Sequence, residues 1–272
     1  MTLKIGASVS MMFRERPLLD RFSAAADAGF DGVEIQFVEE GDPAEMARAA
    51  RAANMPVVLI NLPLGDLMTG GLGLSGIPGR EAEFAAAAER GLAAAGELGA
   101  AFVHLGPSRM TPGTDRAECL ATYARNVETA LAIADRLELG AALLVEQSNP
   151  NDFPGALFAT IGEAAAMVRQ IGAPRFGLLF DLYHVAMTGD DIAAAWTAHG
   201  DVAPHVQFSD APGRHEPGTG AVDILAAISA IRALGYAGWF GAEYRPAADT
   251  IDGLGWLAEW RAQHSSRYGE TA

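Results

Sequence analysis

Four polar residues in the second half of the chain each close an otherwise apolar segment. They are Glu146 at the end of LLVE, Asp181 at the end of GLLFD, Gln207 in HVQF and Glu243 at the end of WFGAE. Successive members are far enough apart for a helix between them, so each is expected on its own strand. Three carboxylates brought together repel one another unless a cation holds them, because like charges raise each other's pKa. The pattern therefore predicts a site for a divalent metal ion.

The expected ligands are all oxygens, provided that Gln207 turns its amide oxygen toward the ion. Oxygen ligands select hard ions such as Mg²⁺ or Mn²⁺, whereas Zn²⁺ favours nitrogen and sulfur. The alternative is that each acid is a solvated strand end, as single acids often are. The coincidence of four such residues favours the metal site.

Other kinds of catalytic site lack their essential parts. Ser75 lies in GLSGI rather than in a nucleophile elbow, and Cys119 lies on an expected helix without a basic partner. The Gly-rich segment that ends at Arg80 lacks the Gly-Lys-Ser/Thr ending of a phosphate-binding loop. We interpret this segment as a mobile cover over a pocket, with a plain surface excursion as the alternative.

The elements that would position these residues are eight short apolar segments, which alternate with stretches of helical periodicity. The segments are 3–9, 32–37, 56–61, 101–105, 141–146, 176–181, 204–208 and 239–243. Several are apolar at consecutive positions, as parallel strands covered on both faces are. Eight such units in 272 residues predict an α/β fold of the (β/α)8 or TIM barrel type, with an open doubly wound sheet as the alternative.

The chain shows no Pro/Ser-rich linker, so residues 1–262 are expected to form one barrel domain, followed by a polar tail over 263–272. Long Gly- and Pro-rich connections at 62–79, 147–156 and 209–221 follow expected strands, and this fold builds active sites from such loops. The residues expected to end helices in the left-handed conformation are Gly29, Gly99, Gly140, Gly172 and Gly235.

Charge and cysteine content limit the partners and the compartment. The chain has 19 Lys and Arg against 34 Asp and Glu, a net charge of −15, whereas nucleic acids and anionic membranes select for basic patches. The single Cys119 excludes an intramolecular disulfide. The first residues alternate like a strand rather than a signal peptide, and no apolar run spans a bilayer. We expect a cytoplasmic protein with a small-molecule partner, no nucleic acid and no membrane; the sequence predicts no oligomeric state.

The segments GASVSMMF, GLSGIPGRE, LLVEQSNP, FDLYH, HVQFSDAPGRHEPGTG and GWFGAEY extend over nearly the whole chain. They resemble the hydroxypyruvate isomerase family of the xylose isomerase-like barrels, which also include ketose 3-epimerases and 2-oxo-tetronate isomerases. The resemblance implies that Glu146 and Glu243 are the catalytic acid/base pair, and that Asp181 and Gln207 complete the metal ligands. Related epimerases usually carry His at the position of Gln207.

The resemblance also implies that His184 and Arg214 contact the substrate, and a guanidinium matches the shape of a carboxylate. A structural histidine and a surface charge are the respective alternatives. Roles stay open for His104, Asn61, Arg80, His215 and Glu216, which lie at strand ends or in the loops of the same face.

The implied activity is a metal-dependent isomerase that interconverts hydroxypyruvate and tartronate semialdehyde, or a related 2-oxo sugar acid, by proton transfer through an enediolate. One Glu would remove the proton and the other would return it. The alternatives are a ketose 3-epimerase, a metal-dependent hydrolase related to zinc-dependent abasic-site endonucleases, and a barrel that binds ligand without turnover. The net charge of −15 and the few histidines argue against the hydrolase.

Overall fold

The computed structural model describes residues 3–267, with side chains described through residue 262. Within this part of the chain, eight parallel strands form a closed barrel, in which β1 pairs with both β2 and β8. The strands are β1 Lys4–Ser8, β2 Gly32–Ile35, β3 Val57–Asn61, β4 Phe102–His104, β5 Ala142–Glu146, β6 Phe176–Asp181, β7 His205–Phe208 and β8 Trp239–Ala242. Each lies within one of the eight predicted segments, so the predicted barrel is confirmed and the open sheet is wrong.

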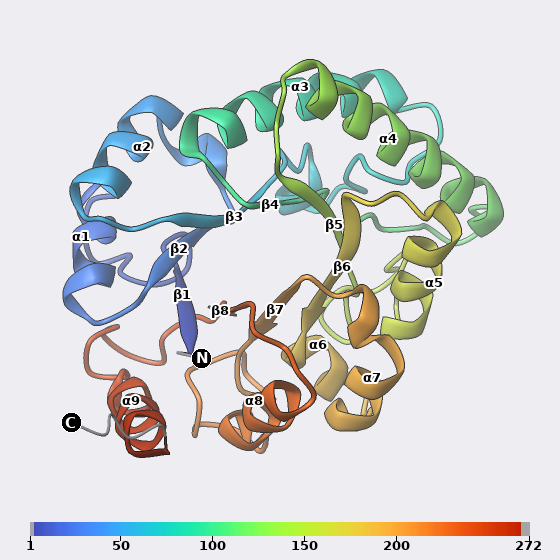
Figure 1. The fold of residues 1–272 in the computed structure, drawn as a ribbon. Coiled ribbons are helices and arrows are strands. Elements are labelled where there is room, and N and C mark those ends of the chain that lie inside the picture. The colour runs from blue at the N-terminus through green and yellow to red at the C-terminus, as the bar shows by residue number, and fades with distance from the viewer. Residues whose placement is uncertain (1–2, 268–272) are drawn as a thin grey trace.

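The helices surround the barrel as an outer ring (Figure 1). They are α1 Asp20–Asp27, α2 Pro43–Ala52, α3 Glu81–Leu98, α4 Arg116–Arg136, α5 Ile161–Ile171, α6 Leu182–Met187, α7 Ile192–His199, α8 Ile224–Ala233 and α9 Gly255–Arg267, with 3-10 turns η1 Val38–Glu40, η2 Leu67–Thr69 and η3 Gly200–Val202. Local chemistry fixes several starts: Thr160 and Glu163 form a capping box on α5, and Asp181 caps α6. The last cap sets a predicted site residue at the junction of β6 and α6.

Helix ends follow the predicted glycines with one exception. Gly172, which ends α5, has a φ of 62°, in the left-handed region where glycine carries no steric cost. After α4, however, the left-handed residue is Glu138, with a φ of 54°. The prediction for Gly140 is therefore wrong. Helix α9 extends to Arg267, and residues 268–272 of the predicted polar tail lie outside the described residues.

The hydrophobic core has two parts. The larger part lies between the strands and the helices and includes Leu143, Val145 and Phe180. A smaller cluster of Leu59, Leu144 and Leu179, joined by Phe102, shares no buried residue with it. Because neighbours on a strand point to opposite faces, Leu144 faces the barrel interior while Leu143 and Val145 face the helices. No helix among the described residues is long and apolar enough to cross a membrane.

Candidate active site

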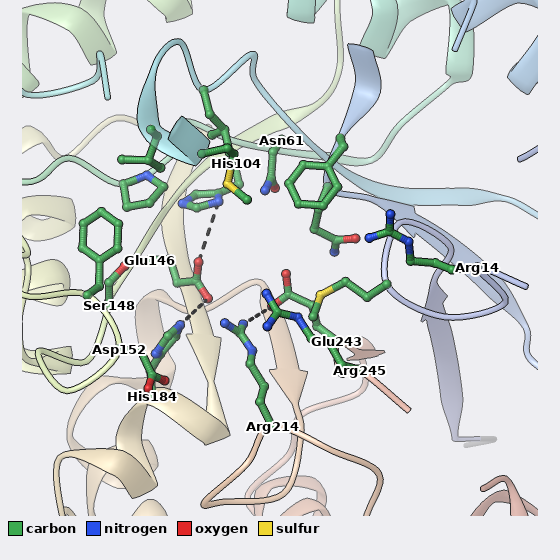
Figure 2. A pocket seen from close by; sticks show the side chains of 18 of the residues that line it. Arg14, Asn61, His104, Glu146, Ser148, Asp152, His184, Arg214, Glu243 and Arg245 are labelled. Carbon is green, nitrogen blue, oxygen red and sulfur yellow. Dashed lines mark hydrogen bonds and ion pairs between the residues drawn. The ribbon is translucent and has the colours of Figure 1, made fainter. Parts of the chain in front are cut away.

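A pocket of about 690 Å³ lies at the carboxyl ends of the strands, the face on which this fold builds active sites. Its lining includes Glu146, His184, Arg214 and Glu243, and Figure 2 shows these side chains converging from different strands and loops. The loop at 62–79 contributes Leu64, Leu67 and Met68 to the same lining. This loop thus lies against the pocket; its predicted mobility stays a prediction.

Glu146, His104 and His184 line the inner part of the pocket, and Asp181 is buried beside them. Glu146 ends β5, and its carboxylate oxygens lie 3.7 Å from His184 Nε2 and 3.7 Å from His104 Nδ1. Asp181 Oδ2 also lies 3.7 Å from His184 Nε2, while its other oxygen accepts the backbone N–H of Tyr183 at 2.9 Å. These strand ends therefore meet, as the sequence pattern predicts.

Arg214 brings a positive charge between two of the predicted metal ligands. Its Nη2 donates to Glu243 Oε2 at 2.5 Å and to Asp181 Oδ2 at 3.3 Å. Glu243 itself lies directly after β8. The loop that carries Arg214 is held by Asp210, whose carboxylate accepts the backbone N–H groups of Gly218 and Gly220. A cation from the chain itself thus already reduces the repulsion that the sequence attributes to a metal ion alone.

Burial shifts the pKa values of these groups. It raises the pKa of Glu146 well above its usual value, with further contributions from Glu243 and Asp181. Burial raises the pKa of Glu243 to about 7, although Arg214 opposes that rise. Burial lowers the pKa of His104 to about 3 and places that of His184 well below its usual value. The histidines are therefore neutral near pH 7, where Glu243 can exchange a proton.

The buried donor atoms of the site meet the needs of a divalent metal ion. Ligand atoms of Glu146, Asp181 and His184 lie within 4.8 Å of one another, so this buried group could hold an ion. The buried oxygens Glu146 Oε1 and Gln207 Oε1 have no hydrogen-bond partner in the described part of the chain. Buried carbonyl and carboxylate oxygens without partners are costly in a protein and are suitable ligands for a hard cation. These residues therefore fit a divalent ion.

Gln207 lies inside the barrel on β7, where it pairs in register with Asp181 on β6 and does not line the pocket. Its Nε2 donates to Glu34 Oε2 at 2.6 Å, and His205, on the same strand, pairs with Glu34 Oε1 at 2.6 Å. Neither Glu34 nor His205 is among the site residues expected from the sequence. The available signal was one charged residue inside the buried strand GVEI, and two polar residues two positions apart in HVQF, where they face the same side.

The residues with open roles separate into two groups. Asn61 and His104 line the pocket. Arg80 pairs with Asp66 at 2.9 Å and so ties the 62–79 loop to the start of α3. His215 Nδ1 donates to the carbonyl of Arg245 at 2.7 Å, and Glu216 accepts the N–H of Ala247 at 3.0 Å. The last three residues thus hold loops around the pocket.

This architecture matches that of a known protein family. A family model described as a xylose isomerase-like TIM barrel matches residues 22–260. The chain belongs to the xylose isomerase-like TIM barrel family. This assignment confirms the family resemblance and the fold drawn from the sequence motifs.

Two named relatives that this xylose isomerase-like barrel matches over nearly its full length are isomerases. A 2-oxo-tetronate isomerase from Cupriavidus necator is 36% identical over 254 residues, which are 93% of this chain and 97% of that protein. The hydroxypyruvate isomerase of Escherichia coli is 30% identical, with 95% of this chain and 100% of that protein covered. A solved structure named AP endonuclease, family 2, from Brucella melitensis is 34% identical, with a TM-score of 0.89, and covers 96% of this chain and 100% of that one. The protein is an isomerase of this family.

Proposed function

We propose that the protein isomerises a small 2-oxo acid with a neighbouring hydroxyl group, such as hydroxypyruvate or a 2-oxo-tetronate, by proton transfer. The observation that carries this proposal is the pair Glu146 and Glu243, two buried carboxyl groups that face one pocket with raised pKa values. The names of the Cupriavidus necator and Escherichia coli relatives support the substrate class.

The two glutamates divide the proton transfer between them. A general base works best when its pKa lies near the working pH, and Glu243 has a pKa of about 7. One carboxylate takes the proton from the carbon that bears the hydroxyl, and the other carboxyl group supplies a proton to the former carbonyl carbon. The hydroxyl proton moves to the former carbonyl oxygen in the same conversion, so the hydroxyl oxygen becomes the new carbonyl oxygen. The enediolate between these steps carries negative charge. Arg214 lies 2.5 Å from Glu243 and is therefore close enough to the reacting carbons to stabilise that charge.

His184 suits a hydrogen bond to the substrate. Its Nδ1 lies 3.2 Å from the backbone nitrogen of Asn149, so Nδ1 accepts that N–H. A neutral histidine that accepts at Nδ1 carries its proton on Nε2, which is the atom that faces Glu146 and Asp181. In this tautomer the Nε2–H donates to a substrate oxygen. Of the buried group that could hold an ion, we therefore assign Glu146 and Asp181 to the metal and His184 to the substrate.

Glu146, Asp181, Gln207 and Glu243 are the proposed ligands of one divalent ion, Mg²⁺ or Mn²⁺. The unpartnered oxygens of Glu146 and Gln207 support this set. When bound, such an ion polarises the substrate carbonyl and lowers the barrier to removal of the neighbouring proton.

Positive charge in the pocket favours an anionic substrate. Arg14, Arg109, Arg214 and Arg245 all line the pocket of a chain whose net charge is −15. Among the described residues, Arg14 and Arg245 have no ion pair at the pocket mouth, whereas most other arginines pair with an acid. The same lining also carries four acids, Glu15, Glu146, Asp152 and Glu243, so the attraction for an approaching carboxylate rests on the two arginines at the mouth rather than on the charge of the whole pocket.

A substrate panel tests the proposal. Hydroxypyruvate, a 2-oxo-tetronate and free ketoses are each supplied with the purified protein and Mg²⁺, Mn²⁺ or chelator, and the products are identified by NMR. We expect metal-dependent isomerisation of the 2-oxo acids. If the protein instead turned over a ketose in preference to the 2-oxo acids, it would be a 3-epimerase. Paired glutamates can also catalyse that reaction, because one can remove a proton from a carbon and the other can return a proton to the opposite face of the same carbon. Absence of turnover on every compound would favour a ligand-binding barrel.

A further inference from the structure

Glu34 is a carboxylate inside the barrel, fully buried on β2 and away from the pocket lining. Its Oε1 lies 2.6 Å from His205 Nε2, and its Oε2 accepts from Gln207 Nε2 at 2.6 Å and from Gln36 Nε2 at 3.1 Å. A buried carboxylate is costly unless its oxygens are well paired. This chain pairs both oxygens, with His205 and Gln207 on β7 and with Gln36 just after β2.

The backbone around Glu34 leaves room for its carboxylate. A Cβ atom at Gly241 on β8 would overlap the Glu34 carboxylate, so any other residue there would force that carboxylate to shift. The pairing of β2 with β3 also shifts register between Val33 and Glu34, an irregularity of the kind that re-aims a side chain. Two separate features of the barrel thus direct Glu34 across the interior toward β7.

This arrangement fixes which way the Gln207 amide faces. A carboxylate oxygen only accepts hydrogen bonds, so the amide group must turn its nitrogen toward Glu34. The amide oxygen then points away from Glu34, and it is buried without a hydrogen-bond partner in the described part of the chain. A buried carbonyl oxygen in that state is either a costly defect or a ligand for a group that the pocket binds.

We propose that Glu34 is a positioning residue for the metal site: it holds Gln207 by the amide nitrogen and thereby presents the amide oxygen to the divalent ion. The inference rests on the metal site of the proposed function and adds to it a residue that contacts the ligand Gln207 from inside the barrel. Carboxylates that orient a metal-ligating side chain from behind are a general feature of metal sites. The negative charge of Glu34 also contributes to the raised pKa values of Glu146, Asp181 and Glu243, so it lies within electrostatic reach of the site.

A charge effect and a positioning effect predict different mutational coupling. If Glu34 acts only through its charge, its loss weakens ion binding equally whether or not Gln207 is present. If Glu34 acts through the Gln207 amide, its loss has no further effect once that amide is gone. A merely structural role would lower thermal stability and leave ion affinity unchanged.

The test is a double-mutant cycle on Mn²⁺ affinity, measured by titration calorimetry with the full chain and no substrate. The variants are Glu34→Gln, Gln207→Leu and the double substitution. The control is Glu39→Gln, which removes the same charge from an exposed position on η1. We expect Glu34→Gln to weaken Mn²⁺ binding by about 10 to 100-fold, the usual loss when a partner of a metal ligand is removed. In the Gln207→Leu background the same substitution should change affinity by less than about threefold.

Equal losses in both backgrounds, or an unchanged affinity of Glu34→Gln, would overturn the proposal. If Glu34→Gln does not fold, the variant Gln207→Leu, with Glu34 intact, decides. Wild-type Mn²⁺ affinity in that variant would mean that there is no ligand for Glu34 to position.

A further variant, Gln207→His, should retain Mn²⁺ binding and gain affinity for Zn²⁺. The reason is that Glu34 can accept one imidazole N–H and leave the other nitrogen for the ion. Loss of both Mn²⁺ and Zn²⁺ binding would also contradict the proposal. A wild-type protein that binds no Mn²⁺ would instead refute the metal site of the proposed function.

Discussion

The two sides of the barrel interior are built from opposite kinds of residue. On the side of β3 to β6, Leu59, Leu144 and Leu179 pack together with Phe102. On the side of β2 and β7, Glu34, His205 and Gln207 form a buried polar cluster. The two sides meet where the rings of Phe102 and His205 stack, with centroids 5.1 Å apart.

This difference separates stability from chemistry. The leucine cluster gains free energy by excluding water and needs no specific partner. The polar cluster costs free energy unless every group is paired, and it still leaves Gln207 Oε1 and His205 Nδ1 without partners among the described residues. A feature that costs stability in a core is retained where it has another task, and this one lies directly beneath the carboxylates of the pocket.

The largest effect is expected above the polar side, at the two glutamates. Glu146→Gln and Glu243→Gln should each lower kcat by about 10² to 10⁴-fold, because each removes a positioned acid or base while keeping the shape of the side chain. Steady-state kinetics with the preferred substrate measures this, and Glu39→Gln serves as the control. A change of only a few-fold in either variant would move that proton transfer to another group, with His184 next.

One substitution on each side of the barrel interior tests whether the leucine cluster serves stability and the polar cluster serves ion binding. Leu179→Ala should lower the free energy of unfolding by about 2 to 5 kcal/mol through the cavity it leaves, with Mn²⁺ affinity unchanged. Gly241→Ala should weaken Mn²⁺ binding, because the new Cβ overlaps Glu34. Denaturant unfolding and calorimetry on both variants give the two quantities. If Leu179→Ala weakened Mn²⁺ binding as much as Gly241→Ala does, the two sides would not be separable.

Ion binding should depend on pH through the carboxyl groups. Glu243 has a pKa of about 7 and must lose its proton before it can ligate an ion, so affinity rises with pH. Between pH 6 and pH 8 the Mn²⁺ association constant should increase about tenfold, and Glu243→Gln should flatten the curve. Calorimetry in buffers of different ionisation enthalpy also counts the protons released. An Mn²⁺ affinity that falls over this range would contradict the claim that Glu243 must lose its proton before it ligates the ion.

The smallest effect is expected at the pocket mouth. Arg245→Gln should raise KM for a 2-oxo acid a few-fold and leave kcat unchanged, because an exposed charge acts mainly on encounter. The effect should shrink at high salt, as exposed charges are screened. The matched substitution Arg51→Gln, on the outer helix α2, should change nothing. An equal rise of KM for a neutral ketose would show that Arg245 does not read the carboxylate.

Strand periodicity sufficed to predict the barrel, since all eight segments became strands. Glu146 and Glu243 reached one pocket, and Asp181 came to lie beside its lining residues His184 and Arg214. Glu34 was overlooked because a single acid in a short strand carries no periodic signal, and its partners lie far along the chain on β7. Glu138 shows a second limit at a helix end, because the left-handed position there is taken by a residue other than the glycine that residue preference indicates. Long-range pairing inside a barrel depends on register, which the sequence pattern does not contain.

The most direct test of the central claim is isomerisation of hydroxypyruvate in D2O by the Mn²⁺-loaded protein, with a control lacking protein. Proton transfer by Glu146 and Glu243 predicts that the tartronate semialdehyde formed carries deuterium on the carbon that receives the proton, and that Glu243→Gln forms it far more slowly. Product without deuterium would indicate direct transfer of hydrogen between the two carbons, and would contradict the acid/base roles given to both glutamates.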